Sequence, residues 1–467
     1  MKKIELELTN TIRISGQLPE RVTRELGKRL IFTNPAYEQA EKFGRSVYGI
    51  PEKLSFIETS NGVTTIPRGF ISQLIKIFDF NGVQYDIKNQ LRRLPSVNFS
   101  FQGKLYPYQE RAVEAILKKH FGILESPTGS GKTTMSLAVI AARRQSSLVV
   151  VHSKELLNQW QQRIEQFLGV PLEEIGLIGD GHTFDESKII HVGIVNSLRK
   201  CSGTIKNFIG FLVVDECHRV PGSTFLEVVS KFDSAFMLGL SATPYRKDGL
   251  TKLIFFFIGD KRYTIETAEL QRNNFIIRPE LRVRETSFEF FYEDNYQEML
   301  TELIEDEARN LLILETVVEH AANGQGVSLI ISDRKGHCAE FFRLLVERGI
   351  KARLLTGSVV SDERRKIVEE IGEGSIDVVC ATSQLISEGF DCKSLAAIHL
   401  AVPVGSSGKL IQSIGRIVRT ASGKRGAVIF DYHDVNIGVL GASFNRRKRV
   451  YQELGIDCNI QQAFAAA

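Results

Sequence analysis

The stretch that decides the fold is FGILESPTGSGKTTMSLAVIAARR, residues 121–144. Its opening apolar run predicts a buried strand, whereas TMSLAVIAARR (134–144) has the composition of a helix. Between them lies SPTGSGKTT (126–134), in which Gly129 and Gly131 allow backbone N–H groups to turn inward toward an anion. A strand, a glycine-rich loop and a helix N-terminus in this order are what a phosphate-binding loop requires.

The side chains of this loop have predicted roles. Lys132 would reach the β- and γ-phosphates of a nucleotide, and the Thr133 hydroxyl would ligate Mg²⁺. The strict motif begins with Gly, and the equally small Ser126 stands there in this chain. A chance loop of Gly and Ser is the alternative, but strand, loop and helix agree. We therefore predict a site for ATP and Mg²⁺ formed by Thr128, Gly129, Ser130, Gly131, Lys132, Thr133 and Thr134.

An acidic pair follows at the end of a second apolar run, in FLVVDECH (211–218). Asp215 stands at a strand end, where a carboxylate that holds Mg²⁺ belongs, and Glu216 could orient and deprotonate an attacking water. His218 is placed to link this site to another element. An acidic strand end on the surface is the alternative. After a phosphate loop upstream, the pair is the expected second half of a nucleotide site.

The chain repeats the strand–helix pattern in two series. At 467 residues it is too long for one ordinary core, so we expect two or three domains. Apolar runs rich in β-branched residues and separated by helical stretches predict parallel sheets covered on both faces. The first series is FGILE, SSLVVVHS, KIIHVGIVN, GFLVVDE and SAFMLGLSAT, and the second is VSLIIS, KARLLTG, IDVVCATS, AAIHLAVP and RGAVIFDYH.

The two series predict two α/β domains, at residues 101–270 and 271–440. Residues 1–100 differ, with alternation in KIELELT and several turn signals, and predict a small mixed α/β domain. They hold 15 Lys and Arg against 10 Asp and Glu, a net charge of +5, whereas the whole chain carries +4. That excess fits contact with a polyanion and equally an ordinary solvated surface. Residues 441–467 are expected to form a basic tail.

The composition excludes several classes of protein. A hydrophobic content of 43% and a charged content of 24% are those of a soluble globular chain. No apolar run is long enough to span a bilayer, and MKKIELELTN lacks the apolar region of a signal peptide, so we expect a cytoplasmic protein without membrane contact. The six cysteines are scattered without a C-x-x-C pair and indicate buried thiols rather than disulfides or a zinc site.

A cluster of arginines lies near the C-terminal end, in QSIGRIVR (412–419). Gln412, Arg416 and Arg419 stand at offsets of four and three, so in a helix all three share one face. Taken alone, such arginines are usually a solvated face. The phosphate loop supplies an anion that two guanidiniums could bind. The positions between them would then face a core: Ile414, Ile417 and Val418.

Taken together, SPTGSGKT, DECH, SAT (241–243) and QSIGRIVR resemble motifs I, II, III and VI of the superfamily 2 helicases and translocases, in the family's order. GLSATPYRKDGL and LYPYQ look most like the XPB-type branch, which includes phage UvsW-like enzymes. An Arg-Glu-Asp motif of the XPB type is missing from the first α/β stretch. Further segments resemble the remaining motifs: LYPYQ (105–109), VVVHSKELLNQW (149–160), VGIVNSL (192–198), SLIISDRKGHCAEF (328–341), LLTGSVVSDERR (354–365) and CATSQLISEGFDCKSL (380–395).

The resemblance implies two tandem RecA-like parallel-sheet domains that face each other across one ATP. Arg416 and Arg419 would then stabilise the transition-state charge on the γ-phosphate, with Gln412 as a polar partner. Because these arginines arrive only when the domains close, hydrolysis would be tied to domain motion. Gln109 would read the adenine. Ser241 and Thr243 would sense the nucleotide, and motif V would add Glu388, Gly389 and Asp391 near the domain interface.

Nucleic acid is the partner that the resemblance implies. Such motors contact mainly phosphates, so hydroxyls, amides and helix N-termini serve as well as lysines. The segments FNRRKRVYQELG (444–455) and IPRGF (66–70) are basic with interleaved aromatics and could hold a flanking duplex, although each is more often an ordinary surface. Trp160 has the spacing of a core residue. The candidate contacts follow predicted strands: Ser153, Lys154, Asn196, Ser197, Thr356, Gly357 and Thr382.

The leading hypothesis is therefore a monomeric ATP-dependent DNA helicase or duplex translocase that acts on single-stranded or branched DNA. A second is a nucleic-acid-stimulated ATPase that remodels without separating strands, such as the motor subunit of a restriction or defence assembly with a protein partner. An RNA helicase is the third. A metabolic kinase is excluded, because it would explain neither the second sheet nor QSIGRIVR.

Overall fold

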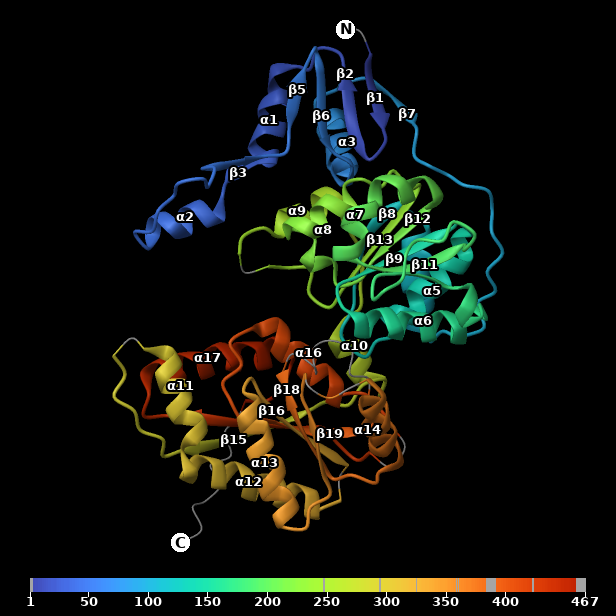
Figure 1. Cartoon of the computed structure of the whole chain (residues 1–467). Helices are drawn as coiled ribbons and strands as arrows, with labels where there is room; N and C mark the ends of the chain where they lie inside the picture. Colours follow the sequence, from blue (N-terminus) through green and yellow to red (C-terminus); the bar gives the residue numbers. More distant parts are fainter. Residues whose placement is uncertain are drawn as a thin grey trace. The chain divides into compact units, whose positions relative to one another are not determined.

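The computed structural model describes residues 3–246, 248–293, 295–324, 326–357, 359, 361–383, 392–421 and 424–458. The chain divides into two compact units, residues 1–126 with 131–265, and residues 266–467 with the short segment 127–130 (Figure 1). The first unit contains the N-terminal sheet and a parallel sheet, and the second contains another parallel sheet. This arrangement confirms the predicted fold class.

The N-terminal part is a mixed sheet with helices on its apolar face. Ile4, Leu6 and Leu8 alternate with half-buried glutamates along the first strand, and their side chains join the core beneath the helices. The strand order is β5-β6-β2-β1-β7, in which only β1 and β7 pair in parallel. The elements are β1 (Ile4–Leu8), β2 (Thr11–Ser15), α1 (Glu20–Leu30), β5 (Glu58–Ser60), β6 (Val63–Pro67), α3 (Ile71–Phe80) and β7 (Tyr85–Asn89).

The segment IPRGF docks this N-terminal domain onto the parallel sheet that follows it. Arg68 is only 3% exposed, donates to the Ser234 carbonyl oxygen at 3.1 Å and lies 4.9 Å from the centroid of the Phe121 ring. Phe70 is fully buried beside Phe256. The segment is therefore neither a site for a flanking duplex nor an ordinary amphipathic surface, because its cation and its aromatic ring are both buried inside the protein.

At Gly69 the N-terminal domain packs directly against the backbone of the first parallel-sheet domain. A Cβ atom there would lie 2.5 Å from the Phe255 carbonyl oxygen and 2.6 Å from the Gly259 nitrogen, on helix α9 (Thr251–Ile258) and the residue that follows it. We expect Gly69→Ala to destabilise the first unit by about 1–3 kcal/mol, as overpacking does. Thermal unfolding should therefore begin several degrees lower, on the order of 2–4 °C per kcal/mol.

Gly27→Ala is the matched control for this prediction. Gly27 lies in helix α1, and a Cβ atom there meets nothing within 4 Å. Alanine should stabilise that helix by about 0.5–1 kcal/mol. If both variants melted like the wild type, the docking contact at Gly69 would be looser than the structure indicates.

The first parallel sheet has the order β10-β11-β9-β12-β13-β8-β14, with every pair parallel. Its five central strands are the five predicted ones, and all are buried. The edge strands β10 (Gly176–Ile178) and β14 (Lys261–Thr264) were not predicted, because each is short or partly polar. The other elements are α4 (Pro107–Leu117), β8 (Phe121–Glu125), α5 (Lys132–Arg143), β9 (Ser147–Val151), α6 (Lys154–Leu168), β11 (Ile190–Ile194), α7 (Val195–Ile205), β12 (Phe211–Val214), α8 (Ser223–Val229) and β13 (Phe236–Ser241). The next helix, α10 (Thr267–Arg272), belongs to the second unit.

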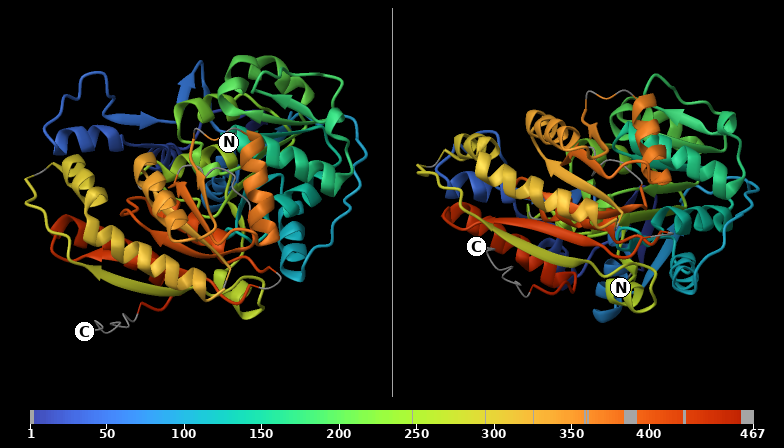
Figure 2. Two further views of the ribbon diagram at one scale, coloured as in Figure 1. Left: turned by 60° about the horizontal axis from the view of Figure 1, so that its bottom comes forward. Right: turned by 90° about the horizontal axis from the view of Figure 1, so that it is seen from below.

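The second parallel sheet has the order β15-β20-β19-β16-β18-β17. Helices α12 and α13 pack on one face, and α16 and α17 pack against β19 and β20 (Figure 2). All five predicted strands are present. The elements are β15 (Glu280–Thr286), α11 (Tyr296–Glu305), α12 (Glu307–Ala322), β16 (Val327–Ser332), α13 (Lys335–Glu347), β17 (Ala352–Leu355), α14 (Ser361–Glu373), β18 (Val378–Thr382), β19 (Leu395–Leu400), α16 (Ser407–Ile417), β20 (Val428–Asp434) and α17 (Gly438–Glu453).

The basic segment near the C-terminus belongs largely to this domain rather than to a tail. Helix α17 includes Phe444 and Tyr451, which are 3% and 0% exposed. Arg447 donates two hydrogen bonds to the Asp431 carboxylate, at 2.7 and 2.8 Å. The expected tail from residue 441 is therefore corrected to a packed helix up to Glu453.

None of the helices in the described residues is long and apolar enough to cross a membrane.

Candidate functional site

The phosphate loop has the conformation that its glycines predict. It joins β8 to α5, and Gly129 and Gly131 have φ values of 89° and 84°, a region that favours glycine. Helix α5 begins at Lys132, and the N-cap Gly131 provides no side chain to satisfy the first N–H groups. These N–H groups and the helix dipole are therefore available to an anion. Lys132 donates from Nζ to the Ser126 carbonyl oxygen at 3.1 Å, which holds its ammonium over the loop.

Two adjacent carboxylates lie just beyond the end of β12. Asp215 is 7% exposed, and its Oδ1 accepts from the Glu216 backbone N–H at 2.9 Å. Burial and the charge of Glu216 raise the pKa of Asp215 to about 6. Burial opposes ionisation of Glu216 as well, but the hydrogen bond from His218 and the charge of Lys132 outweigh it and lower the pKa of Glu216 to about 2. The two neighbouring carboxylates therefore differ in how readily they ionise.

Trp160 holds the first of these carboxylates in place. This side chain on α6 is 1% exposed, and its Nε1–H donates to Asp215 Oδ2 at 2.8 Å. Its assignment to the core is correct, but its hydrogen bond to the site was missed. Spacing along α6 reveals only that Trp160 is buried, and its partner lies 55 residues further along the chain.

His218 connects the acidic pair to the neighbouring strand, as predicted for this residue. Its Nδ1 lies 3.2 Å from Glu216 Oε2 and 3.1 Å from Ser241 Oγ, at the end of β13. Ser241 Oγ also accepts from the Thr243 N–H at 3.1 Å. Glu216 itself has a φ of 48°, a strained value for a residue with a side chain, of the kind that clusters at functional sites. The two strand ends are thus joined by side chains.

Gln109 is packed against the phosphate loop. It lies in α4, is 4% exposed, and its Oε1 accepts from the Tyr106 N–H at 3.0 Å. A Cβ atom on Gly131 would come within 2.4 Å of Gln109 Nε2, so only glycine allows this approach. The amide is therefore fixed beside the loop.

The arginine segment is only partly helical. Helix α16 ends at Ile417, so Gln412 and Arg416 are helical, whereas Arg419 lies two residues beyond the helix. The expectation of one continuous helical face is corrected accordingly. Arg419 forms an isolated bridge with Ile276, and the Ile277 N–H donates to the Val418 carbonyl oxygen at 2.7 Å. The alternate positions are buried as predicted: Ile414, Ile417 and Val418.

Lys424 closes the end of this helix. Its Nζ donates to the Arg419 carbonyl oxygen at 2.7 Å, to the Lys393 carbonyl oxygen at 3.3 Å and to that of Ile417. A lysine at the C-terminal end of a helix satisfies carbonyl groups that lack helical partners. The backbone of Arg419 is therefore held from two sides, by Lys424 and by Ile276.

Two known protein families match the stretches of sequence that carry these sites. Residues 102–246 match the type III restriction enzyme res subunit, and residues 308–421 match the helicase conserved C-terminal domain. The chain belongs to the superfamily 2 helicases and translocases. As a member of that family it is an ATP-dependent enzyme.

Relatives agree with this assignment. The DNA 3'-5' translocase XPB2 of Sulfurisphaera tokodaii is 25% identical over 368 residues, which are 71% of this chain and 82% of that protein. "Probable helicase D10" of Escherichia phage T5 is 25% identical over 312 residues, 66% of this chain and 67% of that protein. The XPB2 match agrees with the resemblance to the XPB-type branch that the sequence motifs carry.

A solved structure supports the fold. Dbp5 of S. cerevisiae, bound to RNA and ADP BeF3, superimposes with a TM-score of 0.52 at 17% identity and covers 82% of this chain and 90% of that one. At this identity the likeness concerns the fold alone, two RecA-like domains.

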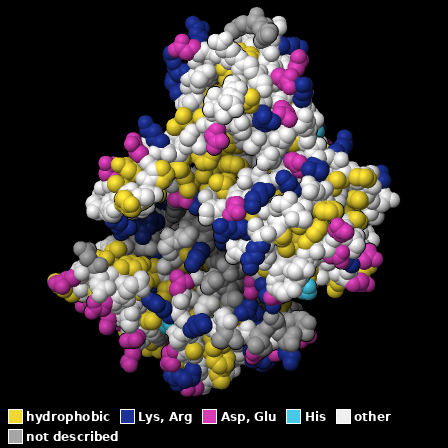
Figure 3. All heavy atoms as spheres, turned by 45° about the horizontal axis from the view of Figure 1, so that its top comes forward, with side chains coloured by type: hydrophobic (Ala, Val, Ile, Leu, Met, Phe, Trp, Pro, Cys, Tyr) yellow, Lys and Arg dark blue, Asp and Glu magenta, His cyan; other side chains and the backbone are white. Residues whose placement is uncertain are grey.

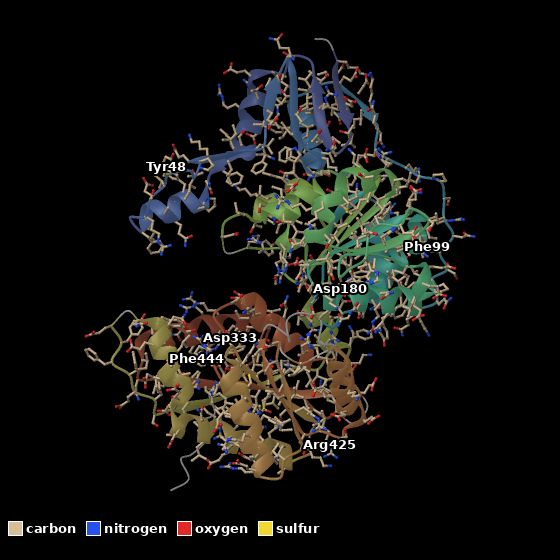
Figure 4. All side chains as sticks on the ribbon, in the orientation of Figure 1. Tyr48, Phe99, Asp180, Asp333, Arg425 and Phe444 are labelled. Carbon is tan, nitrogen blue, oxygen red and sulfur yellow. The ribbon has the colours of Figure 1, made fainter. Side chains whose placement is uncertain are left out.

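In the first RecA-like domain the expected nucleic-acid contacts lie together. Ser153 and Lys154 follow β9, Asn196 and Ser197 follow β11, and these two strands pair in parallel. Ser153 is also the N-cap of α6, where its Oγ accepts from the Leu156 N–H at 3.4 Å. Lys154 pairs with Asp180 at 2.7 Å, a residue labelled in Figure 4.

In the second RecA-like domain the corresponding residues also follow neighbouring strands. Thr356 and Gly357 follow β17, and Thr382 ends β18, its parallel partner. Thr356 and Thr382 are 3% and 8% exposed, so of the three only Gly357 is exposed on the surface. The motif V residues Glu388, Gly389 and Asp391 lie outside the described residues.

Proposed function

We propose that this helicase is a motor that uses ATP and Mg²⁺ to move on DNA, single-stranded or branched. The observation that carries the nucleotide part is the arrangement of Lys132, Asp215 and Glu216 in one domain. Lys132 would bind the terminal phosphates, Asp215 would hold the metal, and Glu216 would accept the proton of the attacking water. Mg²⁺ would neutralise the developing phosphate charge. The Thr133 hydroxyl would complete its ligands.

The acid–base assignment rests on the different surroundings of the two carboxylates. A general base must be ionised at the working pH, and the low pKa of Glu216 meets that need. His218 Nδ1 at 3.2 Å fixes the orientation of Glu216. Asp215, held by the indole N–H of Trp160, would then serve as a metal ligand with a fixed direction.

Trp160 would therefore be a positioning residue for the metal ligand, and Trp160→Phe tests it. The ring is retained but the N–H donor to Asp215 is lost. Removing a hydrogen bond that orients a metal ligand typically weakens metal affinity about 10- to 100-fold. We expect the Mg²⁺ concentration needed to bind a fluorescent ADP analogue, measured by anisotropy, to rise by about tenfold or more.

An internal control separates this effect from a folding defect. Binding of the same analogue in EDTA should be equal in wild type and Trp160→Phe, because phosphate contacts with Lys132 and the loop are untouched. An unchanged Mg²⁺ requirement would show that the indole only fills space.

The choice of DNA is supported by the chain's relatives and by the strand-end loops. XPB2 is named a DNA translocase, and our chain is similar to it in sequence over 71% of its own length. Backbone amides and hydroxyls after β9 and β11 suit phosphate contacts without a strong positive field. Figure 3 shows Lys and Arg side chains interspersed with Asp and Glu over the visible face. RNA is the alternative polymer, since the protein L396 of Acanthamoeba polyphaga mimivirus, 25% identical over 384 residues, is named a putative ATP-dependent RNA helicase.

Steady-state ATP hydrolysis with matched nucleic acids tests the proposal. Single-stranded DNA, duplex DNA, branched DNA and single-stranded RNA of the same sequence are compared in the presence of Mg²⁺. We expect stimulation by single-stranded or branched DNA above that by RNA. Equal or greater stimulation by RNA would favour an RNA helicase. ATP hydrolysis that is stimulated without strand separation would favour a remodelling ATPase.

A further inference from the structure

The N-terminal domain carries an arm whose tip exposes a tyrosine side chain. The arm consists of β3 (Ile31–Thr33), α2 (Pro35–Lys42) and β4 (Lys53–Ser55), and it extends from the mixed sheet (Figure 1). The Ile50 N–H donates to the Val47 carbonyl oxygen at 3.0 Å, and Gly49 has a φ of 76°. These features are those of a type II turn, with Tyr48 at its first central position.

This turn leaves Tyr48 95% exposed (Figure 4). A second aromatic residue, Phe43, is 60% exposed at the end of α2. There the Arg45 N–H donates to the Ala40 carbonyl oxygen at 2.8 Å, and Gly44 has a φ of 61°, so the helix ends in a fixed cap. The Arg45 guanidinium lies 5.6 Å from the Phe43 ring centroid. The exposed rings are thus held by defined backbone structure.

The arm is anchored to the ATP-binding domain within the same unit. Asn34 donates two hydrogen bonds to the residues just before β4. Its backbone N–H donates to the Glu52 carbonyl oxygen at 2.8 Å, and its Nδ2 donates to the Pro51 carbonyl oxygen at 2.9 Å. At the base, the Phe56 ring lies 5.7 Å from that of Phe256 on α9. The tip is therefore connected through these contacts to the predicted ATP-binding domain.

We propose that this tip, residues 42–49, binds the nucleic acid on which the motor acts, at unpaired bases. Tyr48 stacks on an exposed base, and Lys42 and Arg45 contact the flanking phosphates. The proposal rests on the proposed function, because it assumes a nucleic-acid motor. Within the tip the charges are Lys42 and Arg45 alone, and Glu41 and Glu52 lie just outside it.

The chemistry of the tip favours nucleic acid over a protein surface. Proteins dock on contiguous apolar patches, whereas here the rings are separated by Gly44, Arg45 and Ser46. Aromatic rings interleaved with cations are what binds single strands, because every base offers a π-face and every linkage a phosphate. At 95% exposure the Tyr48 ring is accessible to a base.

Fluorescence anisotropy with two labelled DNAs tests the proposal. One is a fork with unpaired arms, and the other is a small covalently closed circular duplex, which has neither free ends nor unpaired bases. We expect Tyr48→Ala to weaken binding of the fork about five- to hundredfold and to leave the closed duplex within twofold of wild type. Tyr48→Phe should bind the fork like wild type, because stacking needs the ring and not the hydroxyl.

Two further variants complete the test. Phe80→Ala removes another exposed ring of the same domain, 91% exposed at the end of α3, and should change nothing. Arg45→Gln should reduce the slope of log affinity against log salt by about 0.7, the value for one phosphate of a single strand. Fork binding by Tyr48→Ala that equals wild type would overturn the tip proposal. If the wild type binds no nucleic acid at all, the proposed function fails instead.

Discussion

Lys132→Ala is expected to reduce ATP turnover by at least about 100-fold, the effect of removing one donor from a site that stabilises developing charge. The loss should appear in both nucleotide affinity and turnover, because the ammonium would contact the terminal phosphates before and during transfer. Turnover is measured by phosphate release at saturating nucleic acid. Hydrolysis near the wild-type rate would overturn the assignment of the phosphate loop.

The fold of this variant should remain intact for local reasons. Lys132 is the first residue of α5, where alanine is a favourable helix former. The side chain donates a hydrogen bond to the Ser126 carbonyl oxygen. Lys231→Ala is the control, since that lysine pairs with Glu227 on the same domain and belongs to no proposed site. It should keep its basal ATP turnover.

The sequence was sufficient for the central strands and for the motif residues. Nine of the ten predicted strands are apolar runs buried over nearly their whole length, which leaves a continuous signal, and the tenth is the edge strand β17, whose Arg353 is exposed. The edge strands β10, β14 and β15 escaped because each is short or partly polar. In β15, for example, only Val283 and Thr286 are buried, so its sequence has no continuous apolar run that would predict a strand.

The remaining differences arise from tertiary contacts that spacing does not encode. IPRGF and a nucleic-acid-binding segment have the same composition, and only the acceptor on Ser234 and the ring of Phe121 decide that Arg68 is buried. The spacing of Trp160 predicts only a core residue, and its hydrogen bond to Asp215 is visible only in the structure. The helix of the arginine segment stops before Arg419 because Lys424 and Ile277 bind the backbone there.

That backbone arrangement makes Arg419→Ala a clean test of catalysis. Two contacts that hold the segment are made by the Arg419 carbonyl oxygen and by the neighbouring Val418 carbonyl oxygen, and alanine retains both. The substitution therefore removes a guanidinium without freeing the segment. If Arg419 stabilises the transferring phosphoryl group, ATP affinity should stay within a few fold while turnover falls about 10³- to 10⁵-fold.

Single-turnover hydrolysis with ATP bound in advance separates the two effects for Arg419→Ala. Arg425→Ala is the matched control, because Arg425 is exposed on the same connection to β20. A lost affinity with an unchanged rate per bound ATP would mean that Arg419 binds the ground state, since a group that acts only in the transition state leaves binding alone. With the expected result, hydrolysis requires both domains, and the chemical step is coupled to the motion that carries the motor along its strand.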